Sequence, residues 1–292
     1  MTPSSVQARP PSHVSETGAF VTAWKLTRNT SPSYSNASKV RDWNRELNNK
    51  PEATNIQEKW QVNFGDVWVA GDHVIYCGDC LEIEIDEQID LVHADPPYGI
   101  SIVRGDNTLG TKNRFELGQY AKVKGDDSGD MAEKAWQKLF DAHRGAVHVW
   151  WGANNYSSHL PSSQCWLFWD KKRSGNYADG ELAWTNHDGA VRVFRHMWNG
   201  MYKESETREK RKHPTQKPIA LAEWVFVKFL KAFNKQTILD PFAGAGFSVI
   251  GAQRTGHRCI AIEYEPAYVA VILERLKAEG LEPRLEKEGE TS

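Results

Sequence analysis

The sequence predicts an α/β fold: a doubly wound, mostly parallel sheet with helices on both faces. Short apolar runs over 74–77, 91–94 and 146–151 end at Gly or Asp and have the continuity of strands buried on both faces. Residues 237–263 are typical of a strand, a glycine turn, a helix and a second strand, which together form a βαβ unit. The chain has 292 residues, of which 40% are hydrophobic, so it can bury a sizeable core.

The N-terminal part of the chain differs from the rest. Residues 1–58 are rich in Ser, Thr, Pro, Asn and charge, without a sustained hydrophobic period, and we expect a polar, partly disordered tail. A short helix near 39–48 is the one element expected there. The main domain is expected over 59–280, and a charged tail over 281–292.

The middle of the chain is predicted to hold a long loop, a helix and two strands. Segment 101–128 is polar and Gly-rich, and loops of that length are usually functional or disordered. Ser128 is a suitable N-cap for the helix that follows, whose apolar residues recur on one side. Further strands are expected near 164–169 and 190–195, ahead of a basic stretch over 199–217.

The C-terminal elements are predicted from start and stop signals. Pro218 suits the first turn of a helix that runs to about Phe233. Gly256 ends the helix that follows the glycine turn, because glycine readily adopts the left-handed conformation of a helix C-terminus. A last helix begins at Pro266 and stops at Gly280.

Charge and composition limit the classes of function. Lys plus Arg number 36 and Asp plus Glu number 38, a net charge of −2, so a nucleic-acid site must be a local patch. No apolar stretch has the length of a membrane-spanning helix and the N-terminus does not resemble a secretion signal, so a cytoplasmic protein without membrane contact is expected. Four cysteines are too few for a disulfide framework.

The glycine turn predicts a cofactor that contains ribose. In the segment Asp240 to Gly246, glycines let a ligand approach the backbone and the N-terminus of the next helix. Glu263 ends the following strand, where a carboxylate can accept both ribose hydroxyls. Val249 stands where a dinucleotide fingerprint needs a third small residue, which disfavours a pyrophosphate. A purely structural turn is the alternative.

A second motif, Asp95-Pro96-Pro97-Tyr98, directly follows the predicted strand 91–94. It therefore lies at the carboxyl end of a strand, where open α/β sheets bind ligands. The prolines remove amide donors and stiffen the turn, so the Asp95 carboxylate and a proline carbonyl remain as acceptors.

Such a pair of acceptors suits an exocyclic amine. If the two acceptors take hydrogen bonds from both N–H groups of the amine, the lone pair stays on the nitrogen and can attack an electrophile. Tyr98 can stack on the base. Base–aromatic stacking is worth roughly 1–3 kcal/mol, which offsets part of the cost of flipping a base out of the duplex. A rigid surface turn is the alternative for this tetrapeptide alone.

Together the two motifs resemble those of the β-group DNA amino-methyltransferases, which methylate adenine N6 or cytosine N4 with S-adenosylmethionine. In that family the target-base motif precedes the cofactor motif, as Asp95–Tyr98 precedes Asp240–Gly246 here. The resemblance covers roughly residues 66–280 and implies that Asp95, Pro96, Pro97 and Tyr98 form the catalytic motif.

The resemblance also implies a set of cofactor-binding residues. The family has a His/Pro-x-Gln-Lys-Pro element ahead of its cofactor turn, which matches His213 to Pro218 and would place Thr215 and Lys217 near the methionine carboxylate. In full, the implied cofactor-binding residues are Asp79, Cys80, Thr215, Lys217, Asp240, Phe242, Gly244, Gly246 and Glu263. One departure is Phe247, which stands where the family often has Thr or Ser.

The strand count supports a circularly permuted order. After Glu263 only one helix and a charged tail are expected, so the third strand of the cofactor half is missing from the C-terminus. The strand 74–77 can supply it, and Asp79 would then accept from the adenine amine of the cofactor. The target-base half is expected over 59–200, with a small recognition insertion, and the cofactor half over 213–280.

Several functions remain open. Adenine is preferred because Asp leads the tetrapeptide, whereas Ser is commoner in N4-cytosine members of the family; an RNA or protein amine is a further alternative. A nicotinamide oxidoreductase would leave the Pro-Pro turn unused, and a nonenzymatic DNA-binding module would not consume cofactor. No metal site is expected, since Cys77 and Cys80 lack two further ligands. The expected partner is DNA, and the expected context is restriction–modification or phage DNA modification. The protein itself is expected to be a monomer or a homodimer.

Overall fold

The computed structural model describes residues 52–97, 130–173, 178–198, 203–207, 215–231 and 234–286. All of them belong to one of the two compact units into which the chain divides, Asn49–Ser292. The helix expected near 39–48 and the long loop expected over 101–128 lie outside the described residues.

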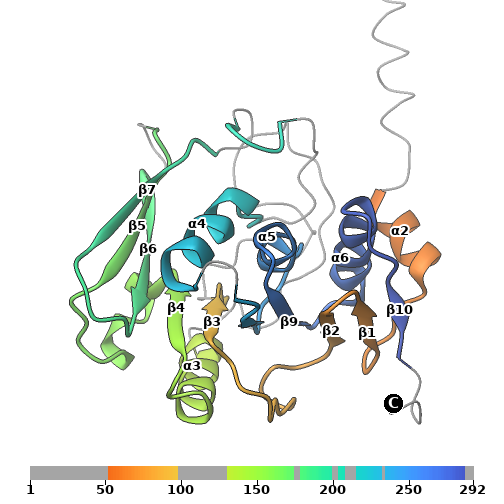
Figure 1. The fold of residues 1–292 in the computed structure, drawn as a ribbon, viewed down its shortest axis with the longest axis horizontal. Coiled ribbons are helices and arrows are strands. Elements are labelled where there is room, and N and C mark those ends of the chain that lie inside the picture. Colours follow the sequence, from red (N-terminus) through yellow and green to blue (C-terminus); the bar gives the residue numbers. More distant parts are fainter. Residues whose placement is uncertain are drawn as a thin grey trace, which may run out of the picture. The chain divides into compact units, whose positions relative to one another are not determined.

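One mixed sheet of ten strands forms the centre of the described part (Figure 1). The strands are β1 (Val67–Ala70), β2 (His73–Cys77), β3 (Leu91–Ala94), β4 (Val147–Trp151), β5 (Trp166–Asp170), β6 (Gly180–Thr185), β7 (Arg192–Arg195), β8 (Thr237–Asp240), β9 (Arg258–Glu263) and β10 (Arg284–Leu285). Their order across the sheet is β10-β1-β2-β9-β8-β3-β4-β6-β5-β7. The neighbours β2, β9, β8, β3 and β4 are parallel, whereas β1 and β6 run antiparallel to both of their neighbours.

Helices cover both faces of the sheet, which confirms the doubly wound α/β class (Figure 1). The helices are α2 (Glu52–Trp60), α3 (Asp130–Ala142), α4 (Ile219–Phe229), α5 (Phe247–Thr255) and α6 (Pro266–Ala278), with short 3-10 helices η1 (Ala153–Asn155) and η2 (Ser157–His159). The helices α4, α5 and α6 share one hydrophobic core on one face, and α3 packs in a second core on the opposite face.

The strands alternate between the two cores. On β4, Trp151 lies in the core of α4–α6 and Trp150 in the core of α3; on β8, Ile238 and Leu239 divide in the same way. All four side chains are fully buried. Because successive strand residues point to opposite faces, apolar residues at consecutive positions are what a sheet covered on both sides requires.

The predicted permuted strand order is confirmed by the pairing of β2 with β9. These strands are parallel neighbours, with Cys77 paired to Glu263, so the N-terminal strand completes the sheet beside the C-terminal βαβ unit. The backbone amide of Cys259 also donates to Nδ1 of buried His73 at 3.1 Å. The cofactor half therefore contains residues from both ends of the described chain.

Some elements differ from the prediction or were not predicted, among them α2, β10 and β6. The helix α2 begins inside the segment expected to be a tail, because Lys59 and Trp60 both bind Glu274 of α6, a partner far along the chain. The strand β10 lies in the expected C-terminal tail and pairs with β1. The strand β6 was not predicted, because it begins with Gly180 and Glu181 and its apolar run is only three residues long.

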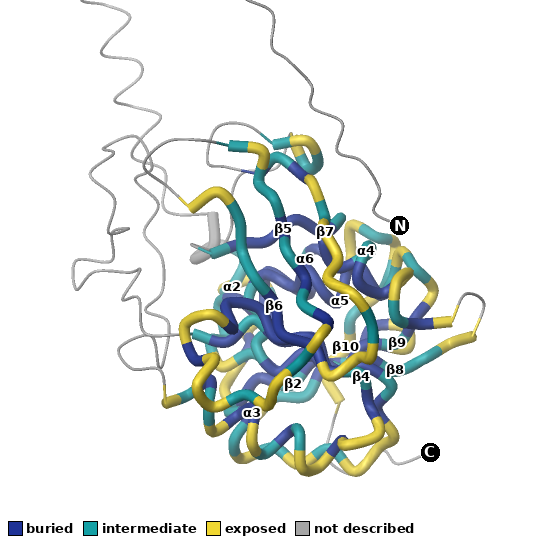
Figure 2. Tube along the Cα trace, turned by 90° about the vertical axis from the view of Figure 1, so that its left-hand side faces the viewer, coloured by how far each residue is buried: buried dark blue, intermediate teal, exposed yellow. Residues whose placement is uncertain are grey.

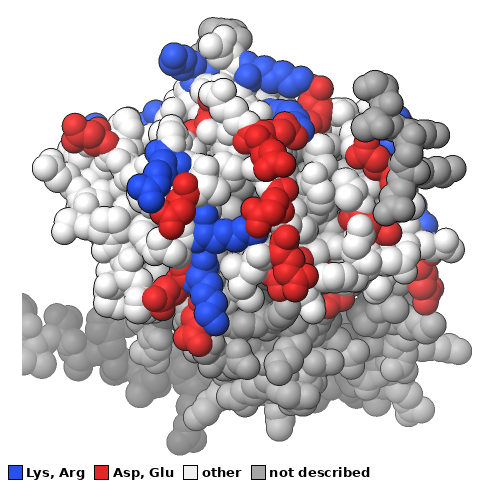
Figure 3. All heavy atoms as spheres, turned by 90° about the horizontal axis from the view of Figure 1, so that it is seen from below, with Lys and Arg blue, Asp and Glu red and all other residues white. Residues whose placement is uncertain are grey.

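Burial decreases from the centre of the sheet to its edge (Figure 2). The edge strand β7 is largely exposed, as is Val193 within it. Acidic and basic side chains are interspersed on the face shown in Figure 3, which fits a net charge of −2. Within the described ranges, no helix has the length and apolar character needed to cross a membrane.

Candidate functional site

Four acidic residues follow or end four adjacent parallel strands of the sheet. Asp79 follows β2, Glu263 ends β9, Asp240 ends β8 and Asp95 follows β3. These strands are neighbours in the order β2-β9-β8-β3, so their carboxyl ends lie at one edge. At about 4.8 Å per strand spacing, the row from β2 to β3 spans roughly 14 Å. The sheet order therefore brings the two predicted motifs to one edge of the sheet.

The glycine turn joins β8 to α5 in a conformation that needs its glycines. Gly244 and Gly246 have φ values of 52° and 79°, in the left-handed region that disfavours other residues. A Cβ on Gly246 would also lie 3.0 Å from Cγ1 of Ile272 in α6. The turn is closed by the amide of Gly246, which donates to the carbonyl of Ala243 at 2.7 Å.

Glu263 has both carboxylate oxygens hydrogen-bonded to the backbone around it. Oε2 accepts the amide of Gly244 at 2.7 Å and Oε1 accepts the amide of Glu265 at 2.9 Å. Burial raises the pKa of Glu263 to about 7, although these two amides lower it. The carboxylate thus links the glycine turn to the start of α6, and each oxygen retains lone pairs for a ligand.

The other predicted acids of the cofactor half are also held by local amides. Asp79 accepts the amide of Leu81 at 2.9 Å, and Asp240 accepts the amide of Phe242 at 3.0 Å. Asp240 is fully buried. Burial raises its pKa to about 7, against the lowering effect of hydrogen bonds from Ser248 and Phe242.

A series of buried hydrogen bonds connects the strands β4 and β3 with the helix α5. The indole Nε1–H of Trp151 donates to Nε2 of His93 at 2.9 Å, and Nδ1 of His93 lies 3.0 Å from the hydroxyl of Ser248. Because an indole can only donate, Nε2 is an acceptor and His93 is neutral with its proton on Nδ1. Burial, and to a lesser degree Lys217, lowers the pKa of His93 to about 3.

Asp95 forms an ion pair with Lys217, which the sequence had associated with the cofactor. Nζ of Lys217 lies 2.7 Å from Oδ2 of Asp95 and 2.9 Å from Oε2 of Glu181. Lys171 approaches the other oxygen of Glu181 at 2.5 Å. The Lys217 side chain is only 3% exposed, so two carboxylates and two ammonium groups balance in a largely buried cluster.

The two carboxylates of this cluster titrate in opposite directions. Burial raises the pKa of Asp95, an effect that Lys217 opposes and Glu181 reinforces. For Glu181 the two lysines outweigh the effect of burial and lower the pKa to about 2. The second oxygen of Asp95, Oδ1, is buried and has no hydrogen-bond partner among the described residues. A buried acceptor without a donor is costly, so it is a position where a ligand N–H would be stabilised.

The remaining predicted site residues lie at different places around these strand ends. Pro96 is buried and Pro97 is half-buried directly after Asp95, whereas Tyr98 lies outside the described residues. Phe242 packs at the edge of the α3 core. Thr215 is half-buried, two residues before Lys217.

The cysteine pair has the character of core residues. Cys77 and Cys80 are buried, and burial raises the pKa of each thiol to about 12. All four cysteines of the chain are described, and none forms a disulfide. A thiol with so high a pKa is a poor nucleophile and a poor metal ligand at neutral pH.

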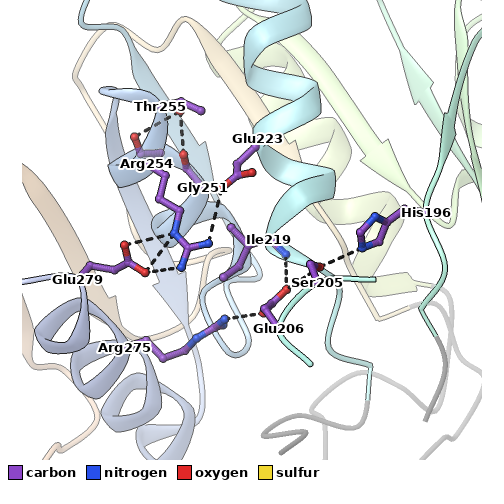
Figure 4. A network of polar contacts seen from close by, with 11 residues as sticks. His196, Ser205, Glu206, Ile219, Glu223, Gly251, Arg254, Thr255, Arg275 and Glu279 are labelled. Carbon is purple, nitrogen blue, oxygen red and sulfur yellow. Dashed lines mark hydrogen bonds and ion pairs between the residues drawn. The ribbon is translucent and has the colours of Figure 1, made fainter. Parts of the chain in front are cut away.

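A network of polar contacts that includes Arg275 of α6 supports the glycine turn (Figure 4). Arg275 donates from Nη1 to the carbonyl of Ala245 at 2.6 Å, and its Nη2 pairs with Glu206 at 2.9 Å. Glu206 accepts the amide of Ile219, at the start of α4, at 2.9 Å. Arg275 and Glu206 are 6% and 5% exposed, so this pair is as buried as the cluster around Lys217.

The same network reaches the strands of the target-base half. Next to Glu206, the hydroxyl of Ser205 lies 2.9 Å from Nε2 of His196, which follows β7 (Figure 4). The segment 203–207 is thereby connected both to the sheet and to the helix α6. Its Glu206 has a φ of 50°, in the left-handed region, at the residue that makes both the Arg275 and the Ile219 contacts.

Several residues of the site were not predicted from the sequence. Glu181 lies opposite Trp169 in the pairing of β5 with β6, and Lys171 directly follows β5. Gly180, next to Glu181, has no room for a Cβ because the backbone of Trp169 and the ring of Phe168 are too close. Nothing local marks Glu181 as different from a surface glutamate. His93 did carry a signal, since it is a polar residue inside the apolar run 91–94.

Several basic residues that could contact the phosphates of a nucleic acid are paired with acidic residues of the protein. Lys171 pairs with Glu181 and also lies 4.7 Å from the ring centroid of Trp169. Lys172 pairs with Glu204 at 2.7 Å. Of the basic stretch 199–217, residues 203–207 and 215–217 are described, and the others lie outside the described residues.

Comparison with protein families and curated proteins shows that this chain is similar to DNA methyltransferases. The profile of the N6/N4 DNA methylase family matches residues 131–274. The type II methyltransferase M2.DpnII of Streptococcus pneumoniae is 25% identical over 229 residues, which cover 66% of this chain and 84% of that protein. The type II methyltransferase M2.LlaDCHI of Lactococcus lactis subsp. cremoris is 25% identical over 228 residues, 65% of this chain and 82% of that protein.

Solved structures give weaker similarities. A putative DNA modification methylase from Thermus thermophilus, in complex with S-adenosyl-L-methionine, is 18% identical with a TM-score of 0.45, covering 70% of this chain and 95% of that one. The cytosine-N4-specific PvuII DNA methyltransferase is 14% identical with a TM-score of 0.49, covering 74% and 94% of the two chains.

Proposed function

We propose that this chain, whose residues 131–274 match the profile of the N6/N4 DNA methylase family, transfers a methyl group from S-adenosylmethionine to the N6 amine of adenine in DNA. The observation that carries the proposal is the row of strand ends. It sets the glycine turn after β8 next to Asp95 after β3, with Glu263 one strand further along, and Oδ1 of Asp95 is buried with no hydrogen-bond partner among the described residues. A cofactor site and an amine acceptor site therefore adjoin each other.

The residues of the cofactor half fit S-adenosylmethionine. Glu263 retains lone pairs for the ribose hydroxyls, and Asp79, beyond the strand paired with β9, is suited to the adenine amine. The turn between Gly244 and Gly246 brings backbone to the ligand without side chains in the way. When bound, this cofactor supplies a methyl group on a positively charged sulfonium, which needs no further activation.

The target-base residues would act on the amine itself. Asp95 Oδ1 and the Pro96 carbonyl each accept one N–H, which keeps the nitrogen lone pair out of the ring and directed at the methyl group. Tyr98 would stack on the flipped base. Once the amine carries the methyl group that the cofactor would supply, its extra proton would pass to Asp95 or to solvent. The protein contributes mainly position and the exclusion of water.

Adenine is proposed over cytosine because Asp95 leads the tetrapeptide, whereas Ser is commoner in N4-cytosine members of the family. The same acceptor geometry serves the N4 amine of cytosine. The decisive experiment incubates the purified protein with unmodified duplex DNA and S-adenosylmethionine carrying a labelled methyl group, followed by digestion to nucleosides and mass spectrometry. Labelled N6-methyladenine is expected. Labelled N4-methylcytosine would show that cytosine is the target base instead. If no nucleoside carried the label, the proposal would be rejected.

A variant separates catalysis from binding. Asp95→Ala removes both carboxylate oxygens but leaves the glycine turn intact, so we expect turnover to be lost while calorimetry still detects cofactor binding. Glu87→Gln is a matched control, because Glu87 pairs with Arg258 at the start of β9, far from the carboxyl ends of the strands. An active Asp95→Ala protein would exclude Asp95 as the amine acceptor.

A further inference from the structure

The feature that the proposed function leaves unexplained is Glu181. It lies on β6, and none of the predicted motifs contains it. Its side chain is 20% exposed and both of its oxygens are near a lysine, Lys217 at 2.9 Å and Lys171 at 2.5 Å. Glu181 is therefore linked to the target-base motif through Lys217.

Lys217 holds Asp95 through one carboxylate oxygen. Its ammonium lies between two carboxylates, 2.7 Å from Oδ2 of Asp95 and 2.9 Å from Oε2 of Glu181. An ammonium is a compact charge that moves toward the nearest anion on a flexible stem. With Glu181 holding it from the other side, Lys217 fixes Asp95 through Oδ2, while Oδ1 stays without a hydrogen-bond partner among the described residues.

We propose that Glu181 is a positioning residue of the methyl-acceptor site, which shares the Lys217 ammonium with Asp95 and so keeps Oδ1 of Asp95 available for the amine of the target base. This inference rests on the proposed function. It assigns a role in amine methylation to a residue that makes no contact with the substrate.

The electrostatic environment of Asp95 gives the inference a measurable consequence. Burial raises the pKa of Asp95, Lys217 lowers it, Glu181 raises it and Lys171 lowers it. Asp240, at the end of the adjacent strand β8, is the other acid that interacts with Asp95. Removing the charge of Glu181 deletes a contribution that raises the pKa and lets Lys217 interact more strongly with Asp95. Both changes lower the pKa of Asp95.

The pH dependence of methylation tests this directly. Asp95 must be ionised to accept the amine, so the acid limb of kcat/KM reports its pKa. In Glu181→Gln we expect this limb to move to lower pH by about one unit or more, as two charges a few ångströms apart interact that strongly near a protein surface. At the plateau we expect kcat to fall about tenfold with little change in KM for DNA, because Lys217 then competes with the amine for Asp95.

Two comparisons separate positioning from a merely structural role. Glu181→Asp keeps the charge, so it should have most of the wild-type kcat and an acid limb of kcat/KM at the wild-type pH. Glu87→Gln removes a carboxylate from an exposed ion pair with Arg258 and should change neither. If Glu181→Gln lowered the melting temperature and activity uniformly at every pH, with an unmoved acid limb, Glu181 would be structural only and the proposal would be wrong.

A second readout does not depend on turnover. In protein labelled with ¹³C at the aspartate carboxyl carbon, the Asp95 signal is assigned by its loss in Asp95→Asn, and its titration midpoint is compared with that in Glu181→Gln. We expect a lower midpoint in Glu181→Gln, and an unchanged midpoint would overturn the inference. If wild-type protein methylated no nucleic acid, the proposed function would fail, while this titration would still decide whether Glu181 acts on Asp95.

Discussion

Glu263 and Asp95 occupy equivalent places at the carboxyl edge of one sheet, yet their oxygens have different partners. Both oxygens of Glu263 accept backbone amides from residues near in sequence or in the same βαβ unit, Gly244 and Glu265. Asp95 has one oxygen on Lys217, more than a hundred residues away, and one oxygen without a described partner. Glu263 thus has a described partner for each oxygen, whereas Asp95 keeps one oxygen that our proposal assigns to the amine of the substrate.

This difference implies that Asp95 depends mainly on long-range charge, whereas Glu263 depends mainly on local backbone geometry. Changes to buried charges should therefore affect the target-base side most. Changes to turn geometry should affect cofactor binding alone.

The largest effect is expected for Lys217→Met. The substitution leaves Asp95 and Glu181 with fewer positive charges in a largely buried place, and breaking a buried ion pair by removing one partner costs about 5 kcal/mol. Urea denaturation at pH 7 should show this loss. Because the penalty comes from ionised carboxylates, the double variant Lys217→Met with Glu181→Gln should recover part of it. Equal stability of the two variants would contradict the shared-lysine arrangement.

A smaller effect is expected for Arg275→Met on the cofactor side. The change removes the cation from buried Glu206 and the donor from the carbonyl of Ala245, so we expect a cost of about 3 kcal/mol. Cofactor affinity, measured by calorimetry, should fall as well, since the glycine turn loses its outer support. Wild-type affinity in this variant would show that the turn holds its shape without α6.

Gly246→Ala should have a purely local effect. At a φ of 79°, and with Ile272 already 3.0 Å from the added Cβ, alanine is strained by about 1–2 kcal/mol. That strain corresponds to roughly a tenfold loss of cofactor affinity if the bound state needs this turn. Gly256→Ala is the matched control, because Gly256 has a φ of 75° but open space around it at the far end of α5. It should reduce stability without changing cofactor affinity.

The smallest effect is expected for Arg254→Gln. Arg254 pairs with Glu279 at 2.5 Å, close to Arg275 in Figure 4, but its side chain is 40% exposed. Exposed pairs of this kind contribute about 0–1 kcal/mol and are screened by salt. Thermal unfolding at low and high ionic strength should show a small difference that disappears in salt, and cofactor affinity should not change.

The parts of the molecule that the sequence predicts are those encoded by local patterns. The βαβ unit, its glycine turn and Glu263 follow one another within a short stretch, and the structure has them as predicted. The place of β2 beside β9 was also predicted, since the third strand of the cofactor half was missing from the C-terminus and the strand 74–77 could supply it. The strands β3 and β4, with their uninterrupted apolar residues, were located to within a residue or two.

What the sequence does not predict are the pairs made across long distances. Glu181 resembles any glutamate at the start of an exposed strand until the fold brings Lys217 to it. Glu206 and Arg275 are equally ordinary in sequence, although their pair supports the glycine turn. Charged side chains are usually exposed, so no pattern in the sequence separates those few that become buried in ion pairs.

The pairing of β2 with β9 has a consequence for how the protein is made. The hydrogen bond from the Cys259 amide to the imidazole of His73 joins residues 186 positions apart. Contacts of such separation form late and slowly in folding, because a long loop must close before they stabilise the structure. A growing chain on the ribosome has the whole of Asp95–Pro97 long before the strand that carries Glu263. The order of synthesis therefore delays cofactor binding, and with it any methylation, until translation has passed β9.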